Sequence, residues 1–272
     1  MDDLREFLRV CEEAVRAGGQ VVQDWAGRFE VRKKGPADLV TQADFASQET
    51  IRKLVLGKFP GHSLLGEESG PDEQKSARTE YRWIVDPLDG TTNYVHGVPH
   101  YCVSLALERN GALLVGAVYD PVLDECFAAA LGQGAWRNGR PIHASGVNTL
   151  ADALAAVGFP PDVRRDSPDL SMFLDMLSRC QAIRRSGSAA LNLCYVAAGR
   201  FDVFWSFSTH AWDVAAGVLI LREAGGVVTS PTGGEFVLDD ARFLAAANPP
   251  LHAQSLDVLL RSVAASRQIA SR

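Results

Sequence analysis

Apolar residues recur every three to four positions in two stretches near the start of the chain. In the first stretch the repeat comprises Leu4, Leu8, Cys11, Val15, Val22 and Trp25. The second runs from Asp44 to Phe59, and Pro60-Gly61 ends it. This spacing is typical of amphipathic helices, and Pro-Gly is a common stop signal. The pattern therefore predicts two helices ahead of any sheet.

The middle of the chain has the pattern of strands. Trp83-Ile84-Val85 is a short apolar run, and from Tyr101 to Ile142 β-prone runs alternate with Asn110-Gly111 and Asn138-Gly139. Asn-Gly favours the tight hairpin turn, in which both central residues adopt positive φ. We expect an antiparallel meander over residues 101–142.

Beyond about residue 148 the pattern changes to short strands that alternate with helices. Helical spacing covers residues 170–180, 189–198, 212–224 and 251–263. Such alternation is typical of a layered α/β structure. We divide the chain into an N-terminal half, residues 1–147, and a C-terminal half, residues 148–272. No long Pro/Gly/Ser linker separates them, so we expect one shared interface with a site between the halves.

Composition narrows the class of protein. The chain has 272 residues, of which 47% are hydrophobic and 22% charged, as in ordinary globular proteins. It carries 33 acidic and 27 basic residues, a net charge of −6. Nucleic-acid-binding proteins usually present a basic face, so no nucleic-acid partner is expected. Clustered acids would instead suit a hard metal ion.

The start of the chain and its cysteines favour a cytoplasmic location. Asp2 and Asp3 stand where a secretory signal needs a basic region. The longest apolar stretch, residues 214–221, is far shorter than the roughly 20 residues needed to cross a bilayer. The five cysteines include no C-x-x-C pair, which favours buried free thiols in a reducing compartment. No membrane contact is expected.

The segment from Trp83 to Asn93 carries the strongest chemical signal. A buried strand delivers Asp86 and Asp89, and Gly90-Thr91-Thr92 follows directly. Two carboxylates at a strand end can converge on divalent cations. Gly90 allows an anion to approach the backbone, and a helix that starts at Thr91 would present free N–H groups to a phosphate. A turn whose aspartates only cap a helix is the alternative.

A covalent phosphatase mechanism is disfavoured by the spacing of these acids. Phosphatases that form an aspartyl-phosphate use D-x-D-G-[TV], whereas Asp86 and Asp89 are separated by two residues. Cys194 and Arg200 match the spacing of cysteine phosphatases but lie in an apolar helical run and not in a glycine-rich loop. Attack on phosphorus by metal-activated water is the chemistry that fits.

Four further acidic residues are ambiguous when each is considered alone. Glu67 and Glu68 lie in a loop between Gly66 and Gly70, where surface charge is the usual explanation. Asp44 and Asp213 each stand in the first turn of an expected helix, where capping explains an acid equally well.

Taken together, these motifs identify a resemblance to a known family. Glu67-Glu68, Asp86-Pro87-Leu88-Asp89-Gly90-Thr91-Thr92-Asn93 and Trp212-Asp213-Val214-Ala215-Ala216-Gly217 resemble the inositol monophosphatase family in order and spacing. The resemblance runs from the first helix to at least Gly226. It implies a layered αβαβα sandwich of the inositol monophosphatase/fructose-1,6-bisphosphatase type. It also implies a homodimer that hydrolyses small phosphate monoesters with two or three Mg²⁺ ions and is inhibited by Li⁺.

The resemblance also implies a metal-ligand set. Glu67, Asp86 and the Leu88 carbonyl match the ligands of a first metal ion. Asp86, Asp89 and Asp213 match those around a second, so that Asp86 bridges the two. Glu68 is expected to act through water molecules around the metals, and Lys33 matches a lysine on a mobile loop.

The catalytic and substrate-binding residues are implied in the same way. Asp44 and Thr91 match the pair that orients and deprotonates the attacking water, with Glu67 also in a catalytic position. The N–H groups of Gly90 and Thr91 match a phosphate grip. The remaining expected substrate contacts, on the side of the alcohol group, are Gly187, Ser188, Ala189, Ser206 and Asp213.

One departure from the family pattern concerns the substrate. Ser206 stands where relatives often have a glutamate that accepts a hydrogen bond from an inositol hydroxyl. We therefore expect a sugar or polyol phosphate, with inositol 1-phosphate a mediocre substrate. Fructose-1,6-bisphosphatase, histidinol-phosphatase and 3′-nucleotidase activities are the nearest alternatives. A regulatory or scaffold protein that keeps the fold is an alternative of another class.

Overall fold

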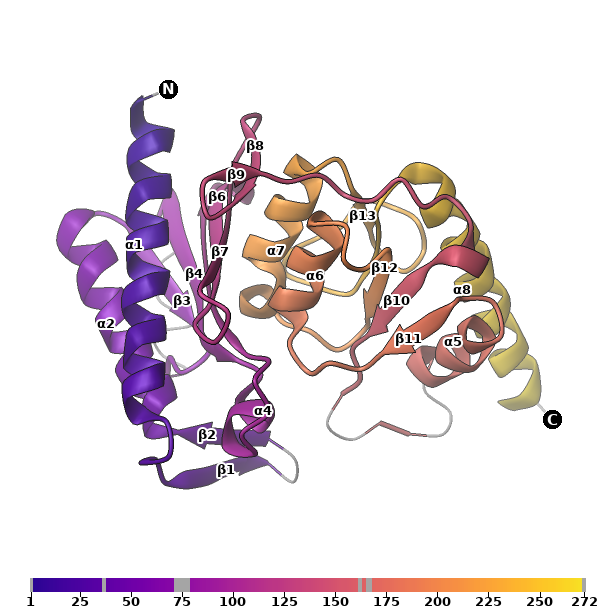
Figure 1. The fold of residues 1–272 in the computed structure, drawn as a ribbon, viewed down its shortest axis with the longest axis horizontal. Helices are drawn as coiled ribbons and strands as arrows, with labels where there is room; N and C mark the ends of the chain where they lie inside the picture. The colour runs from indigo at the N-terminus through magenta and orange to yellow at the C-terminus, as the bar shows by residue number, and fades with distance from the viewer. Residues whose placement is uncertain (1, 36–37, 71–78, 161–162, 165–167, 271–272) are drawn as a thin grey trace.

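The helices and strands of the computed structural model stack in five alternating layers (Figure 1). The structure describes residues 2–35, 38–70, 79–160, 163–164 and 168–270. From the N-terminal side, two helices cover a sheet, two more helices separate it from a second sheet, and a last helix pair covers the far side (Figure 1). The expected αβαβα sandwich is therefore confirmed.

The N-terminal layers consist of two helices on a seven-stranded sheet. Helix α1 (Asp2–Trp25) and helix α2 (Gln42–Lys58) match the two helices that the apolar spacing predicts. In spatial order the sheet comprises β3 (Ser63–Gly66), β4 (Tyr81–Asp89), β5 (Cys102–Arg109), β6 (Ala112–Asp120), β7 (Glu125–Ala130), β8 (Gly134–Arg137) and β9 (Arg140–Pro141). Strand β3 is parallel to β4, and every later pairing is antiparallel. The predicted meander is confirmed.

A small hairpin between the two helices corrects one prediction. Strands β1 (Val31–Gly35) and β2 (Asp38–Thr41) pair as a two-stranded antiparallel sheet, so a sheet does occur before α2. Val31, Arg32 and Lys33 are exposed. Strands that lie outside the core need no alternation of apolar and polar residues, which is why the sequence pattern did not indicate them.

The C-terminal layers are built around a five-stranded sheet. Its spatial order is β11 (Ala182–Arg184), β10 (Leu154–Val157), β12 (Val203–Ser206), β14 (Phe243–Ala246) and β13 (Val227–Thr229). Helices α6 (Ala189–Ala197) and α7 (Ala211–Glu223) lie between the two sheets, and α5 (Pro168–Leu177) and α8 (Pro249–Ala270) pack on the outer face (Figure 1). A short 3₁₀ turn, Leu150–Asp152, precedes β10. No helix among the described residues is both long and apolar enough to cross a bilayer.

Close packing joins the two halves at the central helices. A Cβ atom on Gly116 of β6 would lie 2.9 Å from Ala216 Cα of α7, and one on Gly217 would lie 2.7 Å from Leu193 Cβ of α6. The sequence Ala215-Ala216-Gly217 therefore lets α7 approach both the sheet and its neighbouring helix, as its small residues predict. All five cysteines are free thiols, and all except the half-buried Cys180 are buried.

Candidate active site

Strand β4 delivers two carboxylates at its C-terminal end. Residues 83–88 are fully buried, and the pairing with β5 is interrupted between Asp86 and Asp89. Pro87 has no N–H to contribute to the ladder, which explains an interruption at this point. Within the irregular turn, the Leu88 N–H donates to Asp86 Oδ1 at 3.0 Å.

Four acidic side chains from three separate segments share one electrostatic environment. Burial raises the pKa of Asp86 well above its ordinary value, and the negative charges of Glu67, Asp89 and Asp213 raise it further. Burial and the Asp213 carboxylate likewise raise the pKa of Asp89 to about 7, against the opposing effect of hydrogen bonds from Ser188, Ala190 and Ala189. The fold therefore brings together the acids of the β3–β4 loop, β4 and α7.

The donor set of this cluster suits a divalent cation. It consists of carboxylate oxygens, the hard oxygen ligands that Mg²⁺ prefers. Burial and the neighbouring negative charges raise the pKa of Asp86 and of Asp89, and a bound cation would offset that cost. In the described part of the chain, no three acidic, thiol or imidazole groups are already arranged to hold a metal ion.

Asp44 and Thr91 meet beside the acidic cluster. Asp44 is the third residue of α2, and its Oδ2 accepts hydrogen bonds from the Thr41 N–H at 2.8 Å and the Thr41 hydroxyl at 2.7 Å. Its Oδ1 lies 3.3 Å from Thr91 Oγ1, which also lies 3.0 Å from the Leu88 carbonyl oxygen. The capping role and the contact with Thr91 therefore use different oxygens of one carboxylate.

The turn between β4 and α4 requires glycine. Gly90 has φ +96°, and a Cβ atom there would lie 3.0 Å from the His100 carbonyl oxygen. Helix α4 (Thr91–Val95) begins at the next residue, as the motif predicts. An L-residue with a side chain would be strained in this conformation and would collide with the backbone of the next loop.

The loop before α6 is tied to β4 and α4. Ser188 caps α6 and donates to Asp89 Oδ2 at 2.6 Å, and the Ala190 N–H donates to the same oxygen at 2.7 Å. Gly187 has φ +93°, and a Cβ atom there would lie 2.8 Å from Asn93 Nδ2. That amide donates to the Ser186 carbonyl at 2.8 Å. Sequence reasoning assigned no role to Asn93, because an amide after a Thr-Thr pair has no distinctive signal.

Asp213 enters the site from the first turn of α7. Its Oδ2 accepts the His210 N–H at 2.7 Å, which closes the start of the helix. The carboxylate is partly buried, and its charge acts on both Asp86 and Asp89. Asp213, like Asp44, therefore caps a helix and also contributes to the site.

A cavity of about 450 Å³ extends from the acidic cluster between the two halves. Several of the expected substrate contacts line it, namely Gly187, Ser188, Ala189, Ser206 and Asp213. Of the aromatic residues near Ser206, Phe204 lines the cavity, whereas Trp205 and Phe207 belong to the core against α5 and α8. The cavity wall also includes Phe159 and Arg185, which sequence reasoning missed because isolated residues of these types in loops show no pattern.

Two weaker predictions concern Lys33 and Glu68. Lys33 is exposed on β1, opposite Leu39 of β2. The Glu68 N–H donates to Gln48 Oε1 at 3.0 Å, and the Glu67 N–H donates to the Val85 carbonyl at 3.2 Å. These backbone contacts fix the Glu67-Glu68 loop against α2 and β4.

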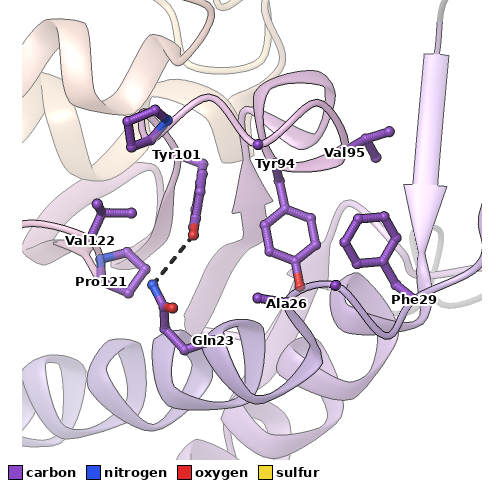
Figure 2. Close-up of a pocket in the computed structure, with 11 residues that line it drawn as sticks. Gln23, Ala26, Phe29, Tyr94, Val95, Tyr101, Pro121 and Val122 are labelled. Carbon is purple, nitrogen blue, oxygen red and sulfur yellow. Dashed lines mark hydrogen bonds between the residues drawn. The ribbon is translucent and has the colours of Figure 1, made fainter.

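A second cavity, of about 410 Å³, lies behind α4 (Figure 2). None of the expected site residues lines it. Its wall shows how α4 is anchored: the Tyr94 hydroxyl donates to the Val22 carbonyl at 2.8 Å. Nearby, Gln23 Nε2 donates to the Tyr101 hydroxyl at 3.3 Å, the dashed line in Figure 2. Aromatic packing and these hydrogen bonds hold α4 and the loop after it against the end of α1.

Comparison with known proteins finds relatives that match nearly the whole chain. Residues 3–267 match the model of the inositol monophosphatase family. Nus factor SuhB of Pseudomonas aeruginosa is 40% identical over 248 residues, which cover 89% of this chain and 92% of that protein. Fructose-1,6-bisphosphatase/inositol-1-monophosphatase of Aquifex aeolicus is 40% identical over 256 residues, 93% of this chain and 94% of that protein. The structure of inositol monophosphatase from Anabaena superposes with a TM-score of 0.84 at 40% identity, covering 96% of this chain and 97% of the other. By the family model, these identities and the shared fold, the chain belongs to the inositol monophosphatase family.

Proposed function

We propose that this chain hydrolyses a small phosphate monoester with Mg²⁺ and a directly attacking water molecule. Family membership makes it a phosphoric monoester hydrolase. The observation that supports the metal dependence is the convergence of Glu67, Asp86, Asp89 and Asp213 beside the contact between Asp44 and Thr91.

In this proposal the acidic cluster holds the metal ions. Glu67, Asp86 and the Leu88 carbonyl would bind one ion, and Asp86, Asp89 and Asp213 would bind a second, out of two or three ions proposed for the site. When bound there, Mg²⁺ would neutralise charge on the phosphate and lower the pKa of the attacking water. The hydrogen bonds from Ser188 and Ala190 fix the orientation of the Asp89 carboxylate.

Thr91 and Asp44 supply the route for the proton. Thr91 Oγ1 accepts a hydrogen bond from the attacking water and donates its own proton toward Asp44 Oδ1, 3.3 Å away. The two hydrogen bonds from Thr41 hold Asp44 in place. The Gly90 and Thr91 N–H groups would hold the phosphate, and the alcohol portion would occupy the cavity near Ser206.

Phosphate release from a panel of esters tests this proposal. The panel contains inositol 1-phosphate, fructose 1,6-bisphosphate, histidinol phosphate and adenosine 3′,5′-bisphosphate, each measured with Mg²⁺ and with excess EDTA. We expect Mg²⁺-dependent release that Li⁺ inhibits, and the relative kcat/KM values would identify the branch of activity. Equal release in EDTA would overturn the metal dependence.

A second candidate function is regulatory binding to a macromolecular partner. One relative carries the name Nus factor SuhB, and an enzyme can keep its activity while it takes a second role. Absence of release across the whole panel, with binding to such a partner, would favour this alternative.

We also propose that the protein is cytoplasmic, which is consistent with its five free cysteines. We propose further that it forms a homodimer, which light scattering would test.

A further inference from the structure

We propose that Arg185 is a specificity-determining residue and that the substrate carries a second anionic group on its alcohol portion. The inference rests on the proposed function, because Arg185 lines the same cavity as Asp89 and Asp213 of the acidic cluster. It concerns the charge of the substrate rather than the chemistry of hydrolysis.

Three charged side chains line the cavity among the described residues. Asp89 and Asp213 are the acidic residues that line it, and both belong to the proposed metal site. Among the described residues of the wall, Arg185 is the only basic one, and the remaining side chains are neutral. If metal ions neutralise the two acids, Arg185 is the charged side chain of the described wall that a substrate group would meet.

The backbone on either side of Arg185 is fixed. Arg184 belongs to β11 and pairs with Ala156 of β10. On the other side, the Ser186 carbonyl accepts a hydrogen bond from Asn93 at 2.8 Å, and the Ser186 hydroxyl donates to Asn192. The position of Arg185 is therefore set by strand pairing and by α4, the helix that begins with Thr91.

The guanidinium is oriented by an aromatic ring and not by an acid. Its Cζ atom lies 5.5 Å from the centre of the Phe159 ring. That ring is itself held edge to face against Phe173 of α5, with centres 5.7 Å apart. Within the described chain, no carboxylate forms an ion pair with Arg185, so the hydrogen-bond donors of the guanidinium are available to a ligand. A planar guanidinium stacked on a ring is well suited to a carboxylate or a phosphate.

Pairs of substrates that differ only in the second charge test the proposal. Glycerol 3-phosphate and 3-phosphoglycerate differ by one terminal carboxylate, and fructose 1-phosphate and fructose 1,6-bisphosphate differ by one phosphate. We expect a kcat/KM ratio that favours the anionic member of at least one pair by about 10-fold, the effect of one charge-assisted hydrogen bond. The responding pair identifies whether the group is a carboxylate or a phosphate.

Variants at two adjacent arginines isolate the contribution of Arg185. In Arg185→Gln the ratio should fall about 10-fold, and Arg185→Lys should keep part of it. Arg184→Gln is the matched control, because Arg184 is also exposed but does not line the cavity. The wild-type ratio should also fall between 50 and 500 mM salt, since exposed charges are screened. A ratio unchanged in Arg185→Gln, or equal losses on both members of each pair, would overturn the proposal.

A binding measurement separates this inference from the proposed function. Titration calorimetry uses phosphonate analogues of the two pairs, in which a methylene group replaces the ester oxygen and prevents hydrolysis. Tighter binding of the anionic member by wild-type protein, lost in Arg185→Gln, would support the inference even if no ester were hydrolysed. Suppose that glycerol 3-phosphate and fructose 1-phosphate, which lack the second anionic group, are hydrolysed and that binding shows no such preference. That result would contradict the inference and leave the proposed function intact.

Discussion

Single carboxylates at this site serve two purposes at once. Asp44 and Asp213 are each the third residue of a helix. Each accepts a hydrogen bond from the backbone N–H of the residue that precedes the helix. A carboxylate has two oxygens, so closing a helix end leaves capacity for a second contact. The two explanations that the sequence left open for these acids, a cap and a functional group, are therefore compatible.

Asp86→Asn should abolish activity without unfolding the protein. The amide removes a proposed metal ligand together with its charge, so we expect kcat/KM to fall about 10³-fold or more, or about 4 kcal/mol of barrier. The same change removes a buried carboxyl group whose pKa is raised by burial and by three neighbouring acids, so the melting temperature without metal should not fall. Near wild-type turnover in the folded variant would contradict the metal-ligand assignment.

Thr91→Ala should slow the chemical step, because it removes the hydroxyl that contacts Asp44. Loss of general-base assistance typically costs about 10²- to 10⁴-fold in kcat. Cys194→Ser is the control: Cys194 is buried in α6, and turnover should stay within a few-fold. Rapid quenching and mass spectrometry should show no phosphoenzyme, and a covalent phosphoryl adduct would refute direct attack by water.

Ser206→Glu should shift preference toward inositol 1-phosphate. Ser206 is buried at the end of β12 and lines the cavity, so a longer side chain there would extend toward the substrate. One charge-assisted hydrogen bond of about 1.5 kcal/mol corresponds to roughly a 10-fold change in the kcat/KM ratio. Circular dichroism would confirm folding, and an unchanged ratio in the folded variant would show that position 206 does not contact the substrate.

At the scale of elements, the predictable segments are those that bury one face against the core. The apolar repeat of α1 and the Asn-Gly turns of the meander have strong local signals, and the structure confirms both elements. The β1–β2 hairpin was missed because its first strand is exposed. Contacts such as Asn93 with Ser186, between residues 93 positions apart, have no local signal in a single sequence.

Two glycine substitutions in helices should have opposite effects on stability. In Gly217→Ala the new Cβ would lie 2.7 Å from Leu193 Cβ, and such overpacking typically costs about 1–3 kcal/mol. Gly57 of α2 is exposed with open space around its Cβ position, so Gly57→Ala should add about 0.5–1 kcal/mol. Urea denaturation would measure both, and equal free energies of unfolding would contradict the close contact between α6 and α7.

At the scale of the whole molecule, the site exists only when separate layers assemble. Its acids come from the β3–β4 loop, the end of β4 and the start of α7, and the last of these lies between the two sheets. Periodicity predicts each element but not their convergence. The ligand set was predicted only because the motifs resemble a family whose residues already meet in space.

Mg²⁺ should therefore stabilise the folded chain as a whole. A cation bound by acids from three segments binds the folded state and not the unfolded one, and at 100 times its Kd it adds about 2.7 kcal/mol. For a chain of this size we expect a rise in melting temperature of about 5–10 °C. Asp213→Asn should remove most of this rise by removing the contribution of α7. Asp257→Asn, an exposed acid on α8 paired with Arg261, should keep it. Equal rises in the two variants would mean that Mg²⁺ binds elsewhere, because only a cation held between the layers links its affinity to Asp213.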